Sequence, residues 1–374
     1  MLSVDWLNPA SLVAEVFNFS REYIAVASTF AFFSILYANA GELSYYVCKM
    51  FFQNILNIFF SSIEVLGREN IPQHGPVIFS GNHMNQFVDG AVALVTCPHK
   101  LNFLVAASSF KMMIVGHFAR LMNAVPVHRP IDNASRATGK INFIGMKLLG
   151  KGTTFKKIDL RDRIRPVKSK NEYKIIEVIS DEEAVLGMDK GDADPMDEII
   201  CQGKDKFVEF DILAWVDQAS VFSNVHTAIH KGESVIIFPE GGSHDNTDLL
   251  PLKGGVAAIA YGALSDHVCI VPVGLNYFRG HRFRGRVVVE YGTPIYITKE
   301  IAHTFQTSKR EAYTTLLSQL ATGMRSVLVT ADSYDDLKLI HTARRLYQRS
   351  STRITTQRRQ DLARRFSMAH RILK

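Results

Sequence analysis

Cysteine is scarce in this chain of 374 residues, and its four copies are scattered. They are Cys48, Cys97, Cys201 and Cys269, and none stands at the paired spacing of a zinc site or a disulfide framework. The pattern excludes a disulfide-stapled secreted domain and predicts no structural metal. It is typical of a protein whose functional site faces the reducing cytosol.

Several nucleotide- and ester-handling motifs are also absent. The chain has no G-x-S-x-G elbow, no phosphate-binding P-loop and no dinucleotide fingerprint. These absences argue against a serine hydrolase, a nucleoside triphosphatase and a Rossmann enzyme. The first forty residues also lack the basic start and small-residue cleavage site of a secretory signal peptide. At 47% hydrophobic residues, the composition allows a sizeable core in one large or two modest domains.

Excess positive charge is confined to the end of the chain. The net charge is +7, yet residues 341–374 alone carry ten lysines and arginines against one carboxylate, Asp361. In this tail Leu362, Phe366, Ala369 and Leu373 recur at helical spacing beside arginines. The pattern predicts a basic amphipathic helix, either lying on an anionic membrane face or packed as an ordinary surface helix.

Charge is missing from a stretch near the start of the chain. Tyr23 to Gly41 is uncharged, and nineteen helical residues would reach roughly 28 Å, just short of a bilayer core. Apolar residues then recur at helical spacing from Met50 to Ile63, as in a helix lying in the membrane interface. Residues 1–66 are therefore expected to form membrane-associated helices that span or dip into a bilayer. The alternative is a pair of helices buried in a soluble core.

The most informative polar stretch runs from Gly81 to Asp89. It follows a short apolar run, Pro76 to Phe79, that is typical of a buried strand. His83 and Asp89 are six positions apart, so they cannot share one face of a regular helix. With His83 in a loop and Asp89 in the first helical turns, the carboxylate would fix one ring nitrogen and leave the other free as a base. The simpler alternative is a helix cap.

A second stretch, Ser234 to His244, repeats this arrangement. An apolar strand stops at Pro239 and is followed by Glu240, Gly241 and Gly242. Two glycines after a strand allow backbone N–H groups to approach an oxyanion or a phosphate.

Four blocks together resemble the membrane glycerolipid acyltransferases, the family that acylates glycerol phosphate and lysophosphatidate. In chain order they are Asn82-His83 with Asp89, Val125 to Arg129, Phe238 to Gly241, and Ile270 to Val273. Longer strings are similar to the fungal-type enzymes that acylate glycerol-3-phosphate and dihydroxyacetone phosphate. These strings are His83 to Asp89, Phe238 to Asp245, Asp248 to Lys253, and Ala343 to Tyr347.

The resemblance implies an α/β fold with a mixed central sheet flanked by helices. The acyltransferase domain would occupy residues 67–300, and residues 301–374 would form a helical basic region. Alternating runs around an acidic stretch predict a small β-rich insertion over residues 150–210, which the fungal-type branch also has.

The activity implied is transfer of an acyl group from acyl-CoA to the sn-1 hydroxyl of glycerol-3-phosphate or dihydroxyacetone phosphate. His83 would be the general base and Asp89 would orient it, while Glu240 would position the acceptor and Arg129 with Lys253 would neutralise its phosphate. The residues expected to bind substrate are Arg129, Glu240, Gly241, Gly242, Ser243, His244 and Lys253. No metal or bound cofactor is implied. The expected partners are acyl-CoA, the phosphorylated acceptor and the endoplasmic reticulum membrane, with the site facing the cytosol, and no nucleic acid.

The chain departs from the common family pattern at two places. Five residues separate His83 from Asp89 where four are usual, and Gly242-Ser243-His244 replace the usual Thr-Arg-Ser. A phosphate-binding arginine is therefore missing from this block, and His244 or Lys253 is expected to substitute. The fungal-type enzymes also continue into a further hydrophobic region, so the chain is expected to be either a shorter member or a truncated one. Two alternative functions remain open: acylation of lysophosphatidate, and lipid binding without catalysis on the same fold.

Overall fold

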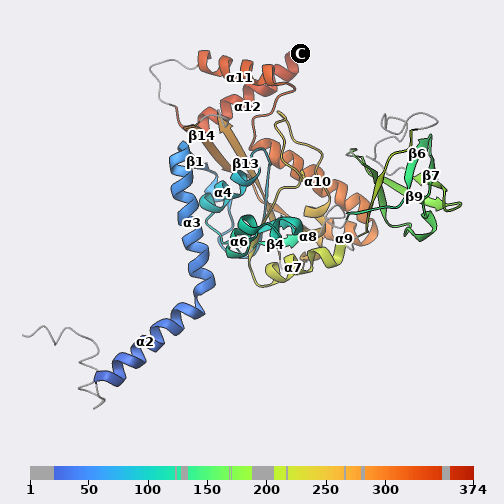
Figure 1. Ribbon diagram of the computed structural model, residues 1–374. Helices are drawn as coiled ribbons and strands as arrows, with labels where there is room; N and C mark the ends of the chain where they lie inside the picture. Colours follow the sequence, from blue (N-terminus) through green and yellow to red (C-terminus); the bar gives the residue numbers. More distant parts are fainter. Residues whose placement is uncertain are drawn as a thin grey trace, which may run out of the picture.

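The computed structural model describes most of the chain. The described residues are 21–122, 124–127, 134–167, 169, 171–187, 206–215, 218–264, 267–278, 283–347 and 354–374. They form an α/β body, a separate all-β unit, a long N-terminal helical arm and a C-terminal helical pair (Figure 1).

The α/β body is built on one mixed sheet. Its strands are β1 (Phe60–Leu66), β2 (Val77–Gly81), β3 (Leu101–Ala106), β4 (Val125–Val127), β12 (Ser234–Ile237), β13 (Cys269–Phe278), β14 (Gly285–Tyr291) and β15 (Ile295–Tyr296). They lie in the order β1-β14-β13-β2-β12-β3-β4, and β15 pairs with β13. Neighbours are parallel except that β13 runs antiparallel to β14 and β15. The predicted mixed central sheet is confirmed.

Helices cover both faces of this sheet, which explains why its central strands are continuously apolar. Successive residues of β2 alternate between the two cores: Phe79 packs on one side and Ile78 on the other. One side is covered by α3 (Ala40–Phe59), α4 (Phe87–Thr96) and α6 (Met113–Leu121), and the other by α7 (Gln218–His230), α8 (Gly255–Gly262), α9 (Lys299–Thr307) and α10 (Lys309–Ser326). The short α5 (Ala107–Phe110) follows β3 and contacts α6. A short 3-10 turn, η2 (Arg68–Asn70), links β1 to β2.

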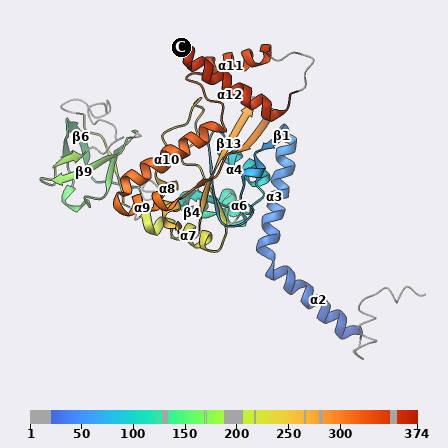
Figure 2. The same cartoon turned by 180° about the vertical axis from the view of Figure 1, so that it is seen from behind.

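The N-terminal arm consists of α2 (Arg21–Ala38) and α3. Helix α2 extends away from the body in both views (Figures 1 and 2), and its residues 26–38 are all exposed. The alternative of two core-buried helices is therefore wrong for α2. Its exposed large apolar side chains are Val26, Phe30, Phe32, Phe33, Ile35, Leu36 and Tyr37. Among the described helices, none is both long enough and apolar enough to cross a bilayer.

Helix α3 carries apolar side chains on both its buried and its exposed face. Tyr45, Cys48, Phe52 and Leu56 are buried against the body, whereas Val47, Met50, Ile55 and Ile58 are exposed. The predicted helix from Met50 to Ile63 is wrong beyond Phe59, because the chain continues as β1 and pairs in parallel with β14. Pairing with a distant strand overrides the local helical spacing.

The all-β unit lies between β4 and α7. Its strands are β5 (Ala134–Arg136), β6 (Lys140–Ile144), β7 (Lys147–Lys151), β8 (Arg163–Pro166), β9 (Tyr173–Val178), β10 (Glu183–Gly187) and β11 (Phe210–Leu213), with the 3-10 turn η4 (Phe155–Lys157). All pairs are antiparallel, in the order β5-β11-β8-β9-β10-β7-β6. Ile141 and Val208 exchange backbone hydrogen bonds, so the edges of the sheet meet and a small barrel closes.

This barrel has its own core, which includes Phe155, Tyr173 and Phe210. The predicted β-rich insertion is therefore present, but its first strand begins at Ala134 rather than near residue 150. The start is not visible in the sequence because residues 134–140, Ala-Ser-Arg-Ala-Thr-Gly-Lys, carry no apolar alternation.

The C-terminal region folds into α11 (Tyr334–Tyr347) and α12 (Thr356–Leu373), which pack on each other beside β14 (Figures 1 and 2). Arg364 Nη1 of α12 lies 2.8 Å from Glu290 Oε2 of β14. The buried face of α12 contains Gln360, Ala363 and Ser367. In the predicted apolar stripe, Leu362 and Phe366 are half-buried, and Ala369 and Leu373 are exposed.

Candidate active site

His83 and Asp89 meet where β2 gives way to α4. His83 lies in the loop after the strand, and Asp89 lies in the first turn of the helix. His83 Nδ1 is 2.8 Å from Asp89 Oδ2, which also accepts a hydrogen bond of 2.8 Å from the Asn85 backbone N–H. The connecting turn includes Gln86 at a φ of 45°, a positive value that is uncommon outside glycine.

The pair leaves one imidazole nitrogen available. The Asp89 side chain is fully buried, whereas the His83 side chain is 20% exposed. Because the carboxylate accepts the Nδ1 proton, Nε2 carries the free lone pair, and within the described part of the chain it has no hydrogen-bond partner. Phe238 stacks on the ring at 4.5 Å between centroids with an interplanar angle of 16°. The imidazole is thus fixed in orientation and open to solvent at one atom.

Tyr277 completes the environment of Asp89. Its hydroxyl donates to Asp89 Oδ1 at 2.5 Å. Burial raises the pKa of Tyr277 well above its usual range, and the neighbouring Asp89 charge adds to this effect. The phenol therefore stays protonated and acts as a donor. This role could not be predicted from the sequence, because a tyrosine near the end of an apolar strand looks like any packed aromatic residue.

Asn82 fixes the loop to the neighbouring strand. Its side-chain Nδ2 donates to the Leu275 carbonyl at 3.1 Å, and its Oδ1 accepts from the Leu275 N–H at 2.7 Å. The buried amide thus substitutes for a pair of sheet hydrogen bonds on β13. This holds the residue before His83 in place.

Glu240 joins the two polar stretches that follow β2 and β12. Its Oε1 accepts from the His83 backbone N–H at 2.9 Å, and its Oε2 accepts from the Leu250 N–H at 2.8 Å. Oε2 also contacts His244 Nε2. The His244 N–H in turn donates to the His83 carbonyl at 3.0 Å. The Glu240 side chain is fully buried, so it holds two loops together. That this carboxylate positions the acceptor stays a prediction, and Glu240 also borders the smaller hollow described below.

His244 has a defined tautomer in this network. Its Nδ1 accepts a hydrogen bond from the Asn246 N–H at 3.1 Å, which leaves the proton on Nε2 facing Glu240. His244 is thus a structural donor to Glu240, and its ring is 12% exposed.

Gly241 forms the turn beside this network with a φ of 76°. A Cβ at this position would lie 2.6 Å from Lys253 Cδ, so glycine allows the lysine side chain to lie over the turn. The Gly241 N–H donates to the Phe238 carbonyl at 3.1 Å and is therefore not available to an oxyanion. The N–H groups of Gly242 and Ser243 have no acceptor among the described residues.

Two hollows flank the His83 and Glu240 loops. A hollow of about 430 Å³ is lined by Glu240, Gly241, Gly242, Ser243, Leu250, Pro251 and Lys253. A cavity of about 830 Å³ is bordered by Asn82, Met84 and Asn85 of the histidine loop and by Tyr277 and His244. Arg129 lies outside the described residues.

Comparison with known proteins identifies a family. A family model described as Acyltransferase matches residues 62–155 and 213–276, which excludes most of the barrel. The chain is 36% identical to glycerol-3-phosphate O-acyltransferase 1 of Saccharomyces cerevisiae over 82% of this chain and 42% of that protein. It is 30% identical to glycerol-3-phosphate O-acyltransferase 2 of the same yeast over 93% of this chain and 50% of that protein. The chain thus spans about half the length of these curated relatives.

One solved structure is also similar to this chain, at a lower sequence identity than the yeast relatives. The 1-acyl-sn-glycerophosphate acyltransferase of Thermotoga maritima aligns with a TM-score of 0.41 and 13% identity, over 81% of this chain and 87% of that one. The family model matches both sequence stretches whose residues meet at the candidate site. With this match and the two yeast relatives, the chain belongs to the acyltransferase family.

Proposed function

We propose that this protein transfers an acyl group from acyl-CoA to the sn-1 hydroxyl of glycerol-3-phosphate or dihydroxyacetone phosphate. The family membership and the names of the two yeast relatives support the reaction class and the acceptor. The observation that carries the proposal is the His83 imidazole, whose Nδ1 is 2.8 Å from a buried carboxylate while Nε2 is free and accessible.

The first step is removal of the acceptor's hydroxyl proton by His83 Nε2. The hydroxyl oxygen attacks the thioester carbon, and the new C–O bond gives a tetrahedral oxyanion. Asp89 stabilises the imidazolium that forms, as a carboxylate does for a catalytic histidine. General-base assistance of this kind contributes about 10²- to 10⁴-fold in rate. The C–S bond then breaks, and His83 returns its proton to the departing CoA sulfur.

Backbone donors near the glycine turn would stabilise the oxyanion. Gly242 and Ser243 are the candidates, because the Gly241 N–H is already bonded to Phe238. Removing one such donor costs about 10²- to 10³-fold in rate in other acyl-transfer enzymes. Lys253, which lies over Gly241, would neutralise the acceptor phosphate. We propose that Arg129 also neutralises the acceptor phosphate, and this assignment rests on the family resemblance alone.

We also propose that the N-terminal arm attaches the protein to the cytosolic face of the endoplasmic reticulum membrane. The exposed apolar side chains along α2 and the outer face of α3 support this. Burial of such surface in lipid is favourable at about 25 cal/mol per Å². Sedimentation with phosphatidylcholine vesicles tests the attachment: the intact chain should co-sediment, and a double substitution Phe30→Ser and Phe33→Ser should weaken it. Equal recovery of both proteins in the supernatant would contradict it.

The acceptor is tested by measuring release of free CoA thiol from the purified chain with acyl-CoA. Glycerol-3-phosphate, dihydroxyacetone phosphate and lysophosphatidate are compared with a reaction that contains no acceptor. The proposal predicts release that depends on glycerol-3-phosphate. Release that depends on lysophosphatidate alone would overturn the acceptor assignment, and acyl-CoA binding without any release would favour a lipid-binding protein.

A further inference from the structure

The larger cavity has a strongly basic end that the acyl-transfer steps above do not use. One wall is the start of β14 with the residue before it, and it contributes Arg286 and Arg284. The opposite wall is α11, which contributes Lys338, His341, Arg344 and Arg345. The other end of the same cavity is bordered by Asn82, Asn85 and Tyr277 beside the catalytic pair. A molecule filling the cavity would therefore reach from these cations to the candidate active site.

Arg344 is the most informative residue of this basic end. Its Nε and Nη1 atoms are shielded from solvent and have no hydrogen-bond partner among the described residues. Burial lowers the pKa of Arg344, and the positive charges of Arg359, Arg345 and Arg286 lower it further. A guanidinium that is partly buried, unpaired and surrounded by other cations is unfavourable unless an anion joins it.

His341 stands one helical turn before Arg344 and adds a second unpaired group. Its Nδ1 is shielded from solvent without a hydrogen-bond partner in the described part of the chain. Its ring meets Phe278 edge-on at 5.8 Å between centroids. Burial and the charges of Arg344 and Arg345 lower the pKa of His341 to about 4. The imidazole is therefore neutral at pH 7 and available as a hydrogen-bond donor.

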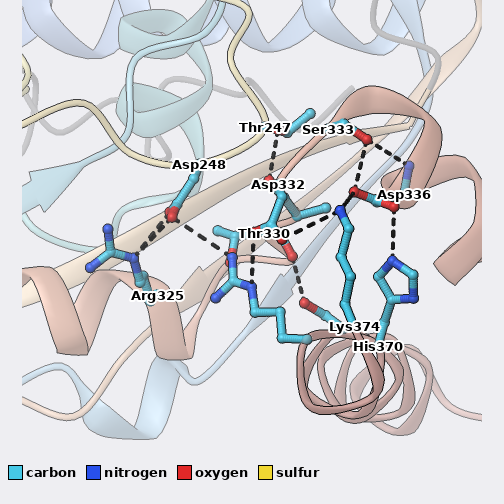
Figure 3. Close-up of polar contacts among 12 residues, drawn as sticks. Thr247, Asp248, Arg325, Thr330, Asp332, Ser333, Asp336, His370 and Lys374 are labelled. Atoms are coloured by element: carbon cyan, nitrogen blue, oxygen red, sulfur yellow. Dashed lines mark hydrogen bonds and ion pairs between the residues drawn. The ribbon is translucent and has the colours of Figure 1, made fainter.

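Helix α11 is held in place by a network at its N-terminal end (Figure 3). Asp336 Oδ1 is 2.8 Å from His370 Nε2, and Asp336 Oδ2 is 3.0 Å from Lys374 Nζ. His370 lies in α12 and Lys374 directly follows it, so the two helices are joined. Asp336 Oδ2 also accepts a hydrogen bond of 2.8 Å from the Ser333 hydroxyl at the start of α11.

The segment that leads into α11 is bonded to the loop that follows Glu240. Thr247 Oγ1 donates to the Ala331 carbonyl at 2.8 Å, and the Ala331 N–H donates to the Thr247 carbonyl at 3.2 Å. Asp248 in the same loop lies 3.0 Å from Arg325 Nε (Figure 3). The basic wall is thus built onto the same loop that positions the candidate site.

We propose that this basic end binds the phosphate groups of the coenzyme A part of the acyl donor. The inference rests on the proposed function, because it assigns the donor of that reaction to the larger cavity. The guanidinium group of arginine binds phosphate oxygens in a bidentate manner. Arg286, Arg344 and Arg345 supply three guanidinium groups to the same cavity. Two carboxylates, Asp245 and Asp248, also line the cavity, and Asp248 is already paired with Arg325.

Size and charge indicate which of the two hollows suits the acyl donor and which suits the acceptor. Coenzyme A carries a pyrophosphate and a separate ribose phosphate, whereas glycerol-3-phosphate is a three-carbon molecule with a single phosphate. The cavity of about 830 Å³ with several arginines suits the larger polyanion. The hollow of about 430 Å³, where Lys253 is the one cation among the described lining residues, suits the smaller one.

Calorimetric binding of free CoA at low salt tests the inference without requiring turnover. Arg344→Ala and Arg286→Ala should each raise the Kd for CoA by about tenfold or more, as expected for loss of a charge-assisted contact. Arg358→Ala is the matched control, because this exposed arginine of α12 does not line the cavity. Its substitution lowers the net charge of the protein by the same amount as each cavity variant, and it should change the Kd by less than about twofold.

Unchanged CoA affinity in both cavity variants would overturn the proposal. A tenfold rise in the KM for glycerol-3-phosphate with unchanged CoA affinity would also overturn it, because the acceptor's phosphate would then occupy this end. Arg286 is exposed on β14, so its substitution keeps the test valid if Arg344→Ala does not fold. If the variants lose CoA affinity but no acceptor supports thiol release, the phosphate site stands and the proposed acyl transfer fails.

Discussion

Replacing Tyr277 with phenylalanine removes one hydroxyl from the environment of Asp89, the carboxylate proposed to orient His83. The hydroxyl donates to Asp89 Oδ1 at 2.5 Å, while Oδ2 is held by His83 and Asn85. A hydrogen bond to a charged group is worth about 1.5 to 3 kcal/mol. Each 1.4 kcal/mol corresponds to a factor of about ten in rate, so Tyr277→Phe should lower kcat by about 10- to 100-fold. The KM values should change little, because the phenol orients Asp89 and takes no part in the transfer.

The assay is steady-state release of CoA thiol with glycerol-3-phosphate, together with denaturant unfolding. Tyr261→Phe is the matched control, since the buried Tyr261 hydroxyl donates to the Ala312 carbonyl at 3.0 Å away from the candidate site. Tyr261→Phe should lose about 1 kcal/mol of unfolding free energy and Tyr277→Phe about 1.5 to 3 kcal/mol, but only Tyr277→Phe should lose kcat. Equal kcat in the two variants would refute the role given to Tyr277.

Three further predictions concern the loops and α11. Glu240→Ala leaves the N–H groups of His83 and Leu250 without an acceptor, so the unfolding free energy should fall by about 3 kcal/mol or more; a fall below about 1 kcal/mol in urea titration would contradict it. Gly241→Ala forces a side chain into a φ of 76°, which costs about 1 to 2 kcal/mol, and should raise the KM for glycerol-3-phosphate by displacing Lys253; an unchanged KM would argue against that role. His341 binds a proton at about pH 6.5 when unfolded but only at about pH 4 when folded, so its contribution to stability is complete above pH 6.5 and is lost as the pH falls toward 4. The difference in Tm between pH 7.5 and pH 5 should therefore be smaller in His341→Gln than in the parent protein. An equal difference would contradict the lowered pKa of His341.

The sequence predicted the parts of the site that depend on neighbours along the chain. The runs before Gly81 and Pro239 are apolar and β-branched, and both form central strands of the sheet. The spacing of His83 and Asp89 excluded a shared helix face, and the structure brings the two together across a loop and a first helical turn. Local sterics and hydrogen-bond reach are enough for inferences of this kind.

The features that the sequence missed depend on contacts between distant segments. Tyr277 lies far from Asp89 along the chain, and nothing in its own strand marks it as a donor. A motif shows residue type and not burial, so it could not show that the Glu240 side chain is buried and accepts hydrogen bonds from the His83 and Leu250 N–H groups. The helical spacing from Met50 continued into residues that pair with β14 instead. The basic cavity forms only when α11 folds back over β14.

The most direct test of the central claim is His83→Ala, assayed by CoA thiol release with acyl-CoA and glycerol-3-phosphate. The variant removes the only atom assigned to take the hydroxyl proton, and its fold is checked by circular dichroism. The account predicts that kcat falls by about 10²- to 10⁴-fold, with CoA affinity retained. Turnover equal to that of the parent protein, in well-folded His83→Ala, would contradict it.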